Sequence, residues 1–369
     1  MDTLGRMKER HGADAAVPPD RRHGRSAATN SSSRFDALTR AIFDDGWSSL
    51  EELPPLKTEV TIERPKKILT RNESPDIGFD RSINPYRGCE HGCVYCFARP
   101  THAYHGLSAG LDFETRLFAK PEAASLLRAE LARPGYRPKP IAIGTNTDPY
   151  QPIERGHRIM RQILEVLDET SHPVGIVTKS HLVTRDLDIL GRMASRGLVK
   201  VALSITTLDR KLARKMEPRA ATPQRRLEAV MRLAEAGVPT TVMVAPVIPG
   251  LTDSEIESIL AASAAAGARH AAYILLRLPL ETRDLFVDWL GEHAPDRAGK
   301  VMSLIRQIRN GKDNDAEFGR RMRGSGPVAW SIGRRFEIAA CKNGLNGERD
   351  PMRTDLFVPP LRDGQLRLL

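Results

Sequence analysis

The sequence predicts an α/β fold in which six parallel strands, each followed by a helix, form an incomplete (β/α)6 barrel. Short apolar runs rich in β-branched residues alternate with amphipathic segments through most of the chain. Such alternation is typical of parallel βαβ units joined by right-handed crossovers. The chain has 369 residues. An α/β barrel needs roughly 250 residues, so extensions are expected at both ends.

The N-terminal part of the chain is expected to lie outside the barrel. Residues 1–34 form a basic stretch rich in Pro, Ser and Arg without apolar periodicity, and we expect them to be disordered. Residues 35–79 form a predicted N-terminal extension. Around and within it, the segment 34–47 has a helical pattern and the segment 56–69 alternates like an extended strand.

The predicted barrel core covers residues 80–295. Its six predicted strands span residues 82–86, 141–145, 174–179, 199–205, 240–248 and 271–278. Its amphipathic helices are predicted over residues 122–133, 158–169, 184–195, 222–237 and 254–267. In α/β barrels the catalytic groups lie on loops that follow the carboxyl ends of the strands. Polar residues that follow these runs are therefore candidate functional residues.

A mainly helical C-terminal extension is predicted over residues 296–369. Its basic segment 318–346 carries Trp330 and Phe336 among arginines, which is a pattern that can bind nucleic acid by stacking and phosphate contact. The helical spacing of its apolar residues favours a helix that closes the open side of the barrel. Cys341 in this segment is expected to be a buried small hydrophobe.

The composition bounds the surroundings of the protein. A net charge of +10 and a pI near 9.6 suggest a nucleic-acid substrate, although charge alone is weak support for one. No apolar run reaches the roughly twenty residues of a membrane helix, so no membrane partner is expected. Without a recognisable signal peptide, a cytoplasmic location is expected. The oligomeric state does not follow from the sequence.

Three cysteines in the first βα loop are the strongest chemical signal. Cys89, Cys93 and Cys96 form a C-x3-C-x2-C motif. Thiolates are soft ligands that select iron-sulfur clusters, zinc or copper. Three thiolates leave one position of such a centre open to another ligand.

These cysteines allow two other interpretations. A structural zinc site needs four ligands, and His91, His102 and His105 are close enough in sequence to complete one. A zinc knuckle therefore stays open as an alternative. A disulfide framework is disfavoured because the fourth cysteine, Cys341, is distant in sequence.

The cysteine motif, with Tyr95 before the last cysteine, resembles the signature of radical S-adenosylmethionine (SAM) enzymes. The longer run NPYRGCEHGCVYCFARPTHAY is similar to the branch related to spore photoproduct lyase, the photolyase-like radical SAM proteins. The resemblance implies a partial TIM-type barrel in which Cys89, Cys93 and Cys96 hold a 4Fe-4S cluster. It also implies that S-adenosylmethionine is cleaved to a 5'-deoxyadenosyl radical, which abstracts hydrogen from a substrate that the sequence does not identify. An external electron donor of the flavodoxin or ferredoxin type would supply the electron.

The resemblance also implies cofactor-binding residues on several strand loops. The positions that match are Tyr95, Thr145, Asn146, Thr147, Lys179, Ser204 and Ile248. Residues Thr145 to Thr147 stand where the superfamily usually has Gly-Gly-Glu and recognises the cofactor amino group. Lys179 and Ser204 match residues that bind the cofactor carboxylate, for which an ammonium and a hydroxyl are suitable donors. Ile248 matches the residue that packs against adenine.

Two further expectations concern the fifth and sixth strand loops. Thr252 and Glu255 have the spacing of a capping box for the next helix. Arg277 follows the sixth strand near the barrel mouth, where it meets either an anionic substrate or an acidic side chain.

Two alternative functions stay open at this stage. A DNA photoproduct lyase is disfavoured because the segment after the second strand, GTNTDPY, lacks the cysteine hydrogen donor of spore photoproduct lyase. The other alternative is a non-catalytic iron-sulfur or zinc protein that binds nucleic acid through its basic surface.

Overall fold

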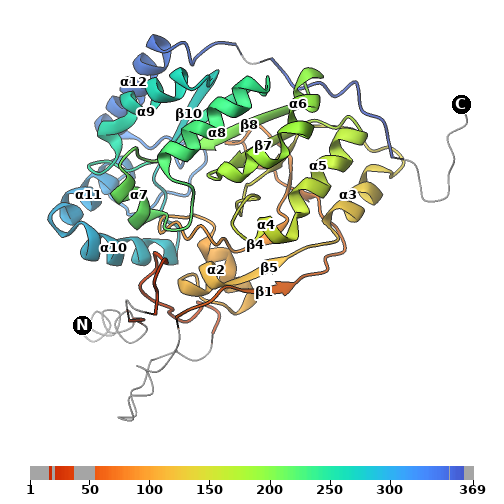
Figure 1. The fold of residues 1–369 in the computed structure, drawn as a ribbon. Coiled ribbons are helices and arrows are strands. Elements are labelled where there is room, and N and C mark those ends of the chain that lie inside the picture. The colour runs from red at the N-terminus through yellow and green to blue at the C-terminus, as the bar shows by residue number, and fades with distance from the viewer. Residues whose placement is uncertain (1–15, 19–20, 37–54, 349, 361–369) are drawn as a thin grey trace, which may run out of the picture.

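The main feature of the structure, a computed structural model, is one curved sheet with helices packed on it (Figure 1). The structure describes residues 16–18, 21–36, 55–348 and 350–360. Within these ranges the sheet has seven strands in the order β10-β9-β8-β7-β6-β3-β2. They are β2 (Thr70–Arg71), β3 (Arg81–Ile83), β6 (Ile141–Ile143), β7 (Val174–Thr178), β8 (Val199–Ser204), β9 (Thr240–Val247) and β10 (His270–Leu275). The strands from β3 to β10 pair in parallel, whereas β2 is antiparallel to β3.

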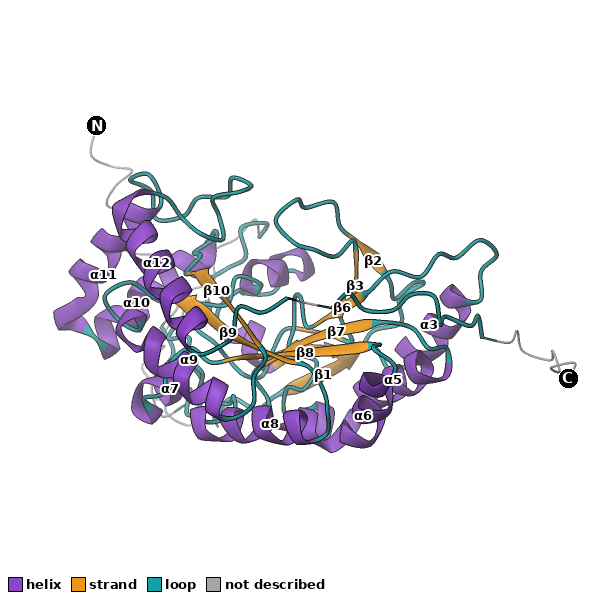
Figure 2. Ribbon diagram, turned by 90° about the horizontal axis from the view of Figure 1, so that it is seen from above, coloured by secondary structure: helices purple, strands orange, loops and turns teal. Residues whose placement is uncertain are grey.

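The sheet confirms the predicted barrel. Each predicted run overlaps one of the six parallel strands, and β2 and β10 form separate edges, so the barrel is incomplete. The crossover helices lie along one side of the sheet (Figure 2). They are α3 (Ala123–Leu131), α5 (Ile159–Glu169), α6 (Leu187–Ser195), α8 (Pro223–Glu235) and α9 (Ile256–Ala265). The start of α8 shows how local sequence sets a boundary: the Thr222 hydroxyl accepts a hydrogen bond from the Arg225 amide, and Pro223 occupies the first turn.

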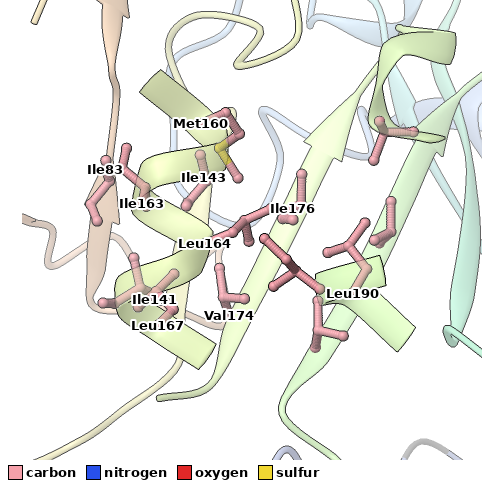
Figure 3. Packing of buried hydrophobic residues seen from close by; sticks show 14 of the residues in the cluster. Ile83, Ile141, Ile143, Met160, Ile163, Leu164, Leu167, Val174, Ile176 and Leu190 are labelled. Atoms are coloured by element: carbon pink, nitrogen blue, oxygen red, sulfur yellow. The ribbon is translucent and has the colours of Figure 1, made fainter. Parts of the chain in front are cut away.

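The largest part of the core lies between the sheet and these helices. In it, the apolar face of α5 packs on neighbouring strands (Figure 3). The contributing side chains are Ile83, Ile141, Ile143, Val174 and Ile176 from the sheet and Met160, Ile163, Leu164 and Leu167 from α5. All are almost fully buried, as expected for a parallel sheet covered by helices.

A small second sheet lies beside the cysteine loop. It consists of β1 (Glu59–Ile62), β5 (Arg116–Ala119) and β4 (Tyr86–Arg87), in the order β1-β5-β4. The extended segment predicted at 56–69 therefore contains a strand. The helix predicted over 34–47 lies almost wholly outside the described residues.

The prediction of disorder through residue 34 is wrong for residues 21–34. Ser26 and Ala27 are buried, and their backbone amides donate hydrogen bonds to the carboxylate of Glu114 at 3.1 and 3.0 Å. Arg25 donates to the backbone oxygen of Glu114 at 2.8 Å. Small and polar residues pack here through hydrogen bonds, which apolar periodicity does not reveal. Residues 1–15 lie outside the described part of the chain.

The C-terminal extension packs on the last strand as a set of helices. After α10 (Glu281–His293) come α11 (Pro295–Ile308) and α12 (Gly326–Lys342). Ile332 and Phe336 of α12 belong to one hydrophobic cluster with Val244 of β9 and Leu275 of β10. This arrangement supports the helical interpretation of the segment. Cys341 is exposed, so the prediction that it is buried is wrong; its position near the end of α12 faces away from the apolar stripe.

In the ranges that the structure describes, no helix has the length and hydrophobicity that crossing a membrane requires.

Candidate active site

A cavity of about 210 Å³ lies at the carboxyl ends of the strands. Its lining comes from the cysteine loop, from the residues that follow β6, and from the carboxyl-terminal parts of β7, β8, β9 and β10 with the residues directly after β7 and β10. The predicted site residues among the lining are Cys89, Cys93, Cys96, Tyr95, Thr145, Asn146, Thr147, Lys179 and Ser204. Residues that are up to 115 positions apart in the chain therefore meet at one site, as the barrel topology predicts.

The cysteine loop is held in place by backbone contacts. The Cys89 amide donates to the Phe113 oxygen at 3.0 Å, and the Val94 amide donates to the Met216 oxygen at 3.0 Å. Gly88 precedes the first cysteine with a φ of 70°, and a Cβ there would lie 2.6 Å from the Leu117 side chain. Only glycine fits this turn without displacing its neighbours.

The three thiols of the cysteine motif line the same cavity. Among the described residues, no three His, Cys, Asp or Glu side chains are placed to hold a single metal ion. The Nε2 atom of His102 lies 2.9 Å from the Arg116 backbone oxygen, and the ring packs on Phe113. The ring of His105 packs on Phe118. These histidines of the zinc alternative are thus held in other contacts.

Burial shapes the protonation of the thiols. It raises the pKa of Cys89, Cys93 and Cys96, and the neighbouring thiols add to this effect for Cys89 and Cys93. Thiols of this kind stay protonated until a bound cation compensates the buried charge. The donor set therefore fits a cationic centre bound through sulfur.

Lys179 and Ser204 lie side by side on the wall of the cavity. They follow Thr178 and Leu203, which are register partners of β7 and β8. The Lys179 ammonium donates to the Ala245 backbone oxygen at 3.2 Å, and burial lowers the pKa of Lys179 to about 8. The Ser204 hydroxyl has no hydrogen-bond partner among the described residues. An ammonium and a free hydroxyl on one wall can receive a carboxylate.

Glu217 is a site residue that the sequence reasoning missed. It is fully buried in side-chain terms, and its carboxylate accepts hydrogen bonds from Tyr95, Thr206 and Arg226. Its Oε1 atom lies 3.6 Å from the Lys179 nitrogen. Glu217 thus joins the cysteine loop to the predicted cofactor lysine. Glu217 follows α7 (Arg210–Met216) and not a strand, so the pattern of polar residues at strand ends does not include it.

The loop after β6 uses its polar groups mainly to hold the site together. The Thr147 hydroxyl donates to the Gly88 oxygen at 2.6 Å, directly before Cys89. Asn84 is hydrogen-bonded to the Thr145 hydroxyl at 3.2 Å and accepts from the Asn146 amide at 2.9 Å. These contacts connect the second strand loop to the first.

Asp148 organises the third loop. Its carboxylate accepts from the Thr178 hydroxyl at 2.7 Å and the Lys179 amide at 2.8 Å, and it lies 3.3 Å from Nδ1 of His91. Burial alone would raise the pKa of Asp148, but His91 and these hydrogen bonds hold it below its usual value.

The expectation for Ile248 differs from the structure. Ile248 is not among the residues that line the cavity; it is fully buried in a hydrophobic cluster with Trp289. Met243, Ala245 and Pro246 line the cavity from β9 instead. These three residues belong to β9 and precede Ile248, which directly follows the end of the strand.

The predicted capping box is also absent. The Thr252 hydroxyl accepts from the Ile248 amide at 3.0 Å. The Glu255 carboxylate accepts from the Thr207 hydroxyl and the Leu208 amide at 2.5 and 2.7 Å. Thr252 thus holds the loop after β9, and Glu255 connects that loop to the loop after β8.

Arg277 lines the cavity beside Phe97. Its guanidinium carbon lies 5.4 Å from the centre of the Phe97 ring, and its Nη1 atom lies 3.8 Å from the Met322 sulfur. Its buried Nε atom has no hydrogen-bond partner in the described chain, and no carboxylate there forms an ion pair with it. Burial and the nearby Arg321 lower the pKa of Arg277.

Comparisons with known proteins agree with this geometry. The model of the radical SAM superfamily matches residues 83–262. An uncharacterized protein of Mycobacterium tuberculosis (strain ATCC 25618 / H37Rv) is 41% identical over 233 residues, which are 63% of this chain and 68% of that protein. A radical SAM Nalpha-GlyT isomerase of Pseudomonas phage M6 is 23% identical over 309 residues, covering 74% of this chain and 62% of the phage protein.

Solved structures share the fold at low sequence identity. A spore photoproduct lyase mutant superposes with a TM-score of 0.58 at 15% identity, covering 83% of this chain and 85% of that chain. Spore photoproduct lyase complexed with dinucleoside spore photoproduct gives a TM-score of 0.57 at 16% identity, covering 77% and 78%. The sequence match, the sheet order and the cysteine loop agree, and the chain therefore belongs to the radical SAM superfamily and is a radical SAM enzyme.

Proposed function

We propose that Cys89, Cys93 and Cys96 hold a 4Fe-4S cluster, and that S-adenosylmethionine binds along the wall that carries Lys179 and Ser204. The observation that supports this most directly is that three thiols, an ammonium and a free hydroxyl line one cavity. When bound, the two groups would supply one-electron cleavage chemistry and hydrogen abstraction.

The residues of the chain have separate tasks under this proposal. Lys179 and Ser204 donate hydrogen bonds to the carboxylate of the cofactor. Glu217 and the Ala245 oxygen fix the position of the Lys179 ammonium. Tyr95, the residue before Cys96, donates a hydrogen bond to the carboxylate of Glu217 and so connects the cysteine loop to it. Apolar residues such as Leu276 limit the access of water.

The substrate is proposed to carry an anionic group that contacts Arg277. A partly buried guanidinium without a carboxylate partner in the described chain is available to a ligand. The ring of Phe97 beside it is 48% exposed and offers a flat surface for stacking. We expect the reaction to be of the lyase or oxidoreductase type.

A nucleic-acid substrate is the second candidate. It is favoured by the net charge of +10 and by Trp330, which is 72% exposed near the exposed Arg334. Against it, other arginines of the basic segment are used within the fold. Arg335 pairs with Glu257 at 2.7 Å, and Arg321 pairs with Asp76.

Photoproduct cleavage remains disfavoured within this second candidate. The lining of the cavity after β6 contains Thr145, Asn146 and Thr147 and no cysteine hydrogen donor.

Anaerobic reconstitution tests the proposal. With S-adenosylmethionine and dithionite, the protein should release 5'-deoxyadenosine and contain about four iron and four sulfide per chain. Cys93→Ala should lose both properties, whereas the matched control Cys341→Ala, at an exposed cysteine, should keep them. Stoichiometric zinc without a brown chromophore would contradict the assignment.

A further inference from the structure

We propose that an acidic one-electron carrier of the flavodoxin or ferredoxin class docks on a basic patch formed by α7 and the residues after it. The patch consists of Arg210, Lys211, Arg214, Lys215 and Arg219. The inference rests on the proposed function, because reductive cleavage of S-adenosylmethionine consumes one electron that this chain does not supply.

The charge of this segment is concentrated and exposed. Residues 208–226 contain seven Lys or Arg residues and two acidic residues. The acidic residues offset only part of this charge. Glu217 is buried with Arg226, and the exposed Asp209, which caps α7 by accepting hydrogen bonds from the amides of Lys211 and Leu212, adds one negative charge at the start of the helix.

The four cations of α7 have no ion-pair partner among the described residues. In contrast, surface arginines on other helices are paired: Arg128 with Glu169 at 2.5 Å, and Arg192 with Asp168 at 2.9 Å. Within α7, the pairs at spacing i, i+4 are Arg210 with Arg214 and Lys211 with Lys215. Like charges at this spacing destabilise a helix. The arrangement is therefore unfavourable for the isolated fold and favourable for an acidic partner.

The basic patch is attached directly to the cysteine loop. The last residue of α7, Met216, accepts a backbone hydrogen bond from Val94 at 3.0 Å, and the Arg219 amide donates to the His91 oxygen at 3.3 Å. The Arg219 side chain pairs with Glu90 at 3.0 Å. The segment that follows α7 thus contacts the chain between the first and last cysteine. A carrier protein bound to the basic patch is separated from the three thiols by the cysteine loop.

A second cavity lies beside one residue of the basic patch, Arg219. A cavity of about 190 Å³ is lined by Arg155, His181 and Arg219, and it shares His91 with the cavity of the cysteines. The side chain of His91 is 2% exposed and belongs to both linings. The polar and cationic lining of this second cavity suits a carboxylate of the incoming carrier.

The chemistry and size of the surface fit this class of partner. The reduced carrier gives up one electron and is oxidised by one electron, and no atom or group is transferred. Electron-transfer encounters use small interfaces, and charge complementarity raises their association rate. A compact group of five cations is sufficient for such an encounter, and its effect should weaken with salt.

The test uses the full chain and a flavodoxin as the probe. We expect calorimetry at low salt to detect binding of the flavodoxin, and the double charge reversal Lys211→Glu with Arg214→Glu to weaken it about tenfold or more. The matched control, Arg334→Glu with Lys342→Glu, reverses two exposed cations of α12 and should bind like the wild type. Raising the salt concentration should remove the difference between the variants.

A second measurement separates this inference from the proposed function. The α7 variant should form 5'-deoxyadenosine as fast as the wild type with dithionite and about tenfold more slowly with reduced flavodoxin. If the wild type forms none with dithionite, the proposed function fails, while the binding titration still decides on the docking site. Equal flavodoxin affinity of the α7 variant and the wild type would overturn the inference. So would loss of binding to a duplex oligonucleotide in the α7 variant with flavodoxin binding intact, since the patch would then be a nucleic-acid surface.

Discussion

The hydroxyl of Tyr95, one residue before the last cysteine, donates a hydrogen bond to the buried carboxylate of Glu217. The same carboxylate accepts from Thr206 and Arg226 and lies 3.6 Å from the Lys179 ammonium. One side chain therefore fixes both the loop that carries the thiols and the lysine that we assign to the cofactor. The negative charge of Glu217 also compensates the positive charges of Arg226 and Lys179, which lie beside it.

Removing this carboxylate should destabilise the protein strongly. In Glu217→Ala, the Arg226 guanidinium stays buried without its carboxylate, and breaking a buried ion pair in this way costs about 3 to 5 kcal/mol. Denaturant unfolding measures the loss. The control Glu228→Ala removes a carboxylate that is 34% exposed on α8 and should change the unfolding free energy by less than about 1 kcal/mol. A similar small effect of both variants would show that Glu217 is not the centre of the network.

Lys179→Ala should weaken S-adenosylmethionine binding and leave the metal content unchanged. A charge-assisted hydrogen bond contributes roughly 1.5 to 3 kcal/mol, so the affinity should fall about tenfold to a hundredfold. Calorimetry on the reconstituted protein measures the affinity, and iron analysis serves as the control. Ser204→Ala removes a neutral donor to the same cofactor carboxylate and should have the smaller effect, at the lower end of this range, about 1.5 kcal/mol. If Lys179→Ala bound S-adenosylmethionine as tightly as the wild type, Lys179 would be an ion-pair partner of Glu217 and not a cofactor-binding residue.

Stability should fall as the pH drops below neutrality because of His172. Burial lowers the pKa of His172 to about 4, and its ring is held by Tyr136 at 2.8 Å and by the Pro173 oxygen at 3.0 Å. An unfolded chain binds a proton near pH 6.5, whereas the folded ring does so only near pH 4. The contribution of the neutral His172 ring to the unfolding free energy is therefore complete above about pH 6.5. It is lost between about pH 6.5 and pH 4, by about 1.4 kcal/mol per pH unit.

A variant isolates this contribution. His172→Asn cannot take up the proton, so its unfolding free energy should depend less steeply on pH between about 6.5 and 4 than that of the wild type. Denaturant unfolding at several pH values gives both slopes. His102 has a pKa lowered to about 4 for the same reason and should leave a residual slope in the variant. Identical slopes for variant and wild type would contradict the assignment.

The sequence predicted the sheet and most of the lining of the site because both depend on local patterns. Apolar runs and amphipathic helices determine the order of the parallel strands, and strand ends then place Cys89, Lys179 and Ser204 at one edge. Glu217 could not be predicted in this way. It enters the site from a helix–helix connection, and two of its partners, Tyr95 and Lys179, come from distant segments.

The errors have a related cause. Ile248 was placed by the match to the motif, whereas the residues of this segment that line the cavity, Met243, Ala245 and Pro246, precede it in β9. Residues 21–34 looked disordered because their packing depends on one buried carboxylate, that of Glu114, and not on an apolar stripe. Contacts between polar groups that are distant in sequence leave no periodic pattern.

The buried Arg309 and the partly buried Arg277 provide the last prediction, because only Arg309 is used by the fold. Arg309 donates to four backbone oxygens, those of Leu275, Leu276, Arg320 and Arg321, at 2.6 to 3.1 Å. Arg277 contacts the Met322 sulfur and the Phe97 ring and has no such acceptors in the described chain. Removal of the Arg309 guanidinium therefore leaves four backbone oxygens without this donor, whereas removal of the Arg277 guanidinium leaves no such oxygen.

Arg309→Met should lower the unfolding free energy by about 2 to 4 kcal/mol, because it removes hydrogen bonds from a charged donor and leaves buried carbonyl groups unsatisfied. Arg277→Met should leave stability unchanged or raise it by about 0.5 to 2 kcal/mol, since a poorly satisfied buried charge is replaced by an apolar side chain of similar length. Denaturant unfolding of the pair measures both effects without any substrate. Unchanged or higher stability of Arg277→Met would show that the fold does not need this guanidinium. Because Arg277 lines the cavity, it is then available to bind a ligand. If Arg277→Met instead destabilised the protein as much as Arg309→Met, its guanidinium would be a structural element, and the proposed contact with an anionic substrate would lose its support.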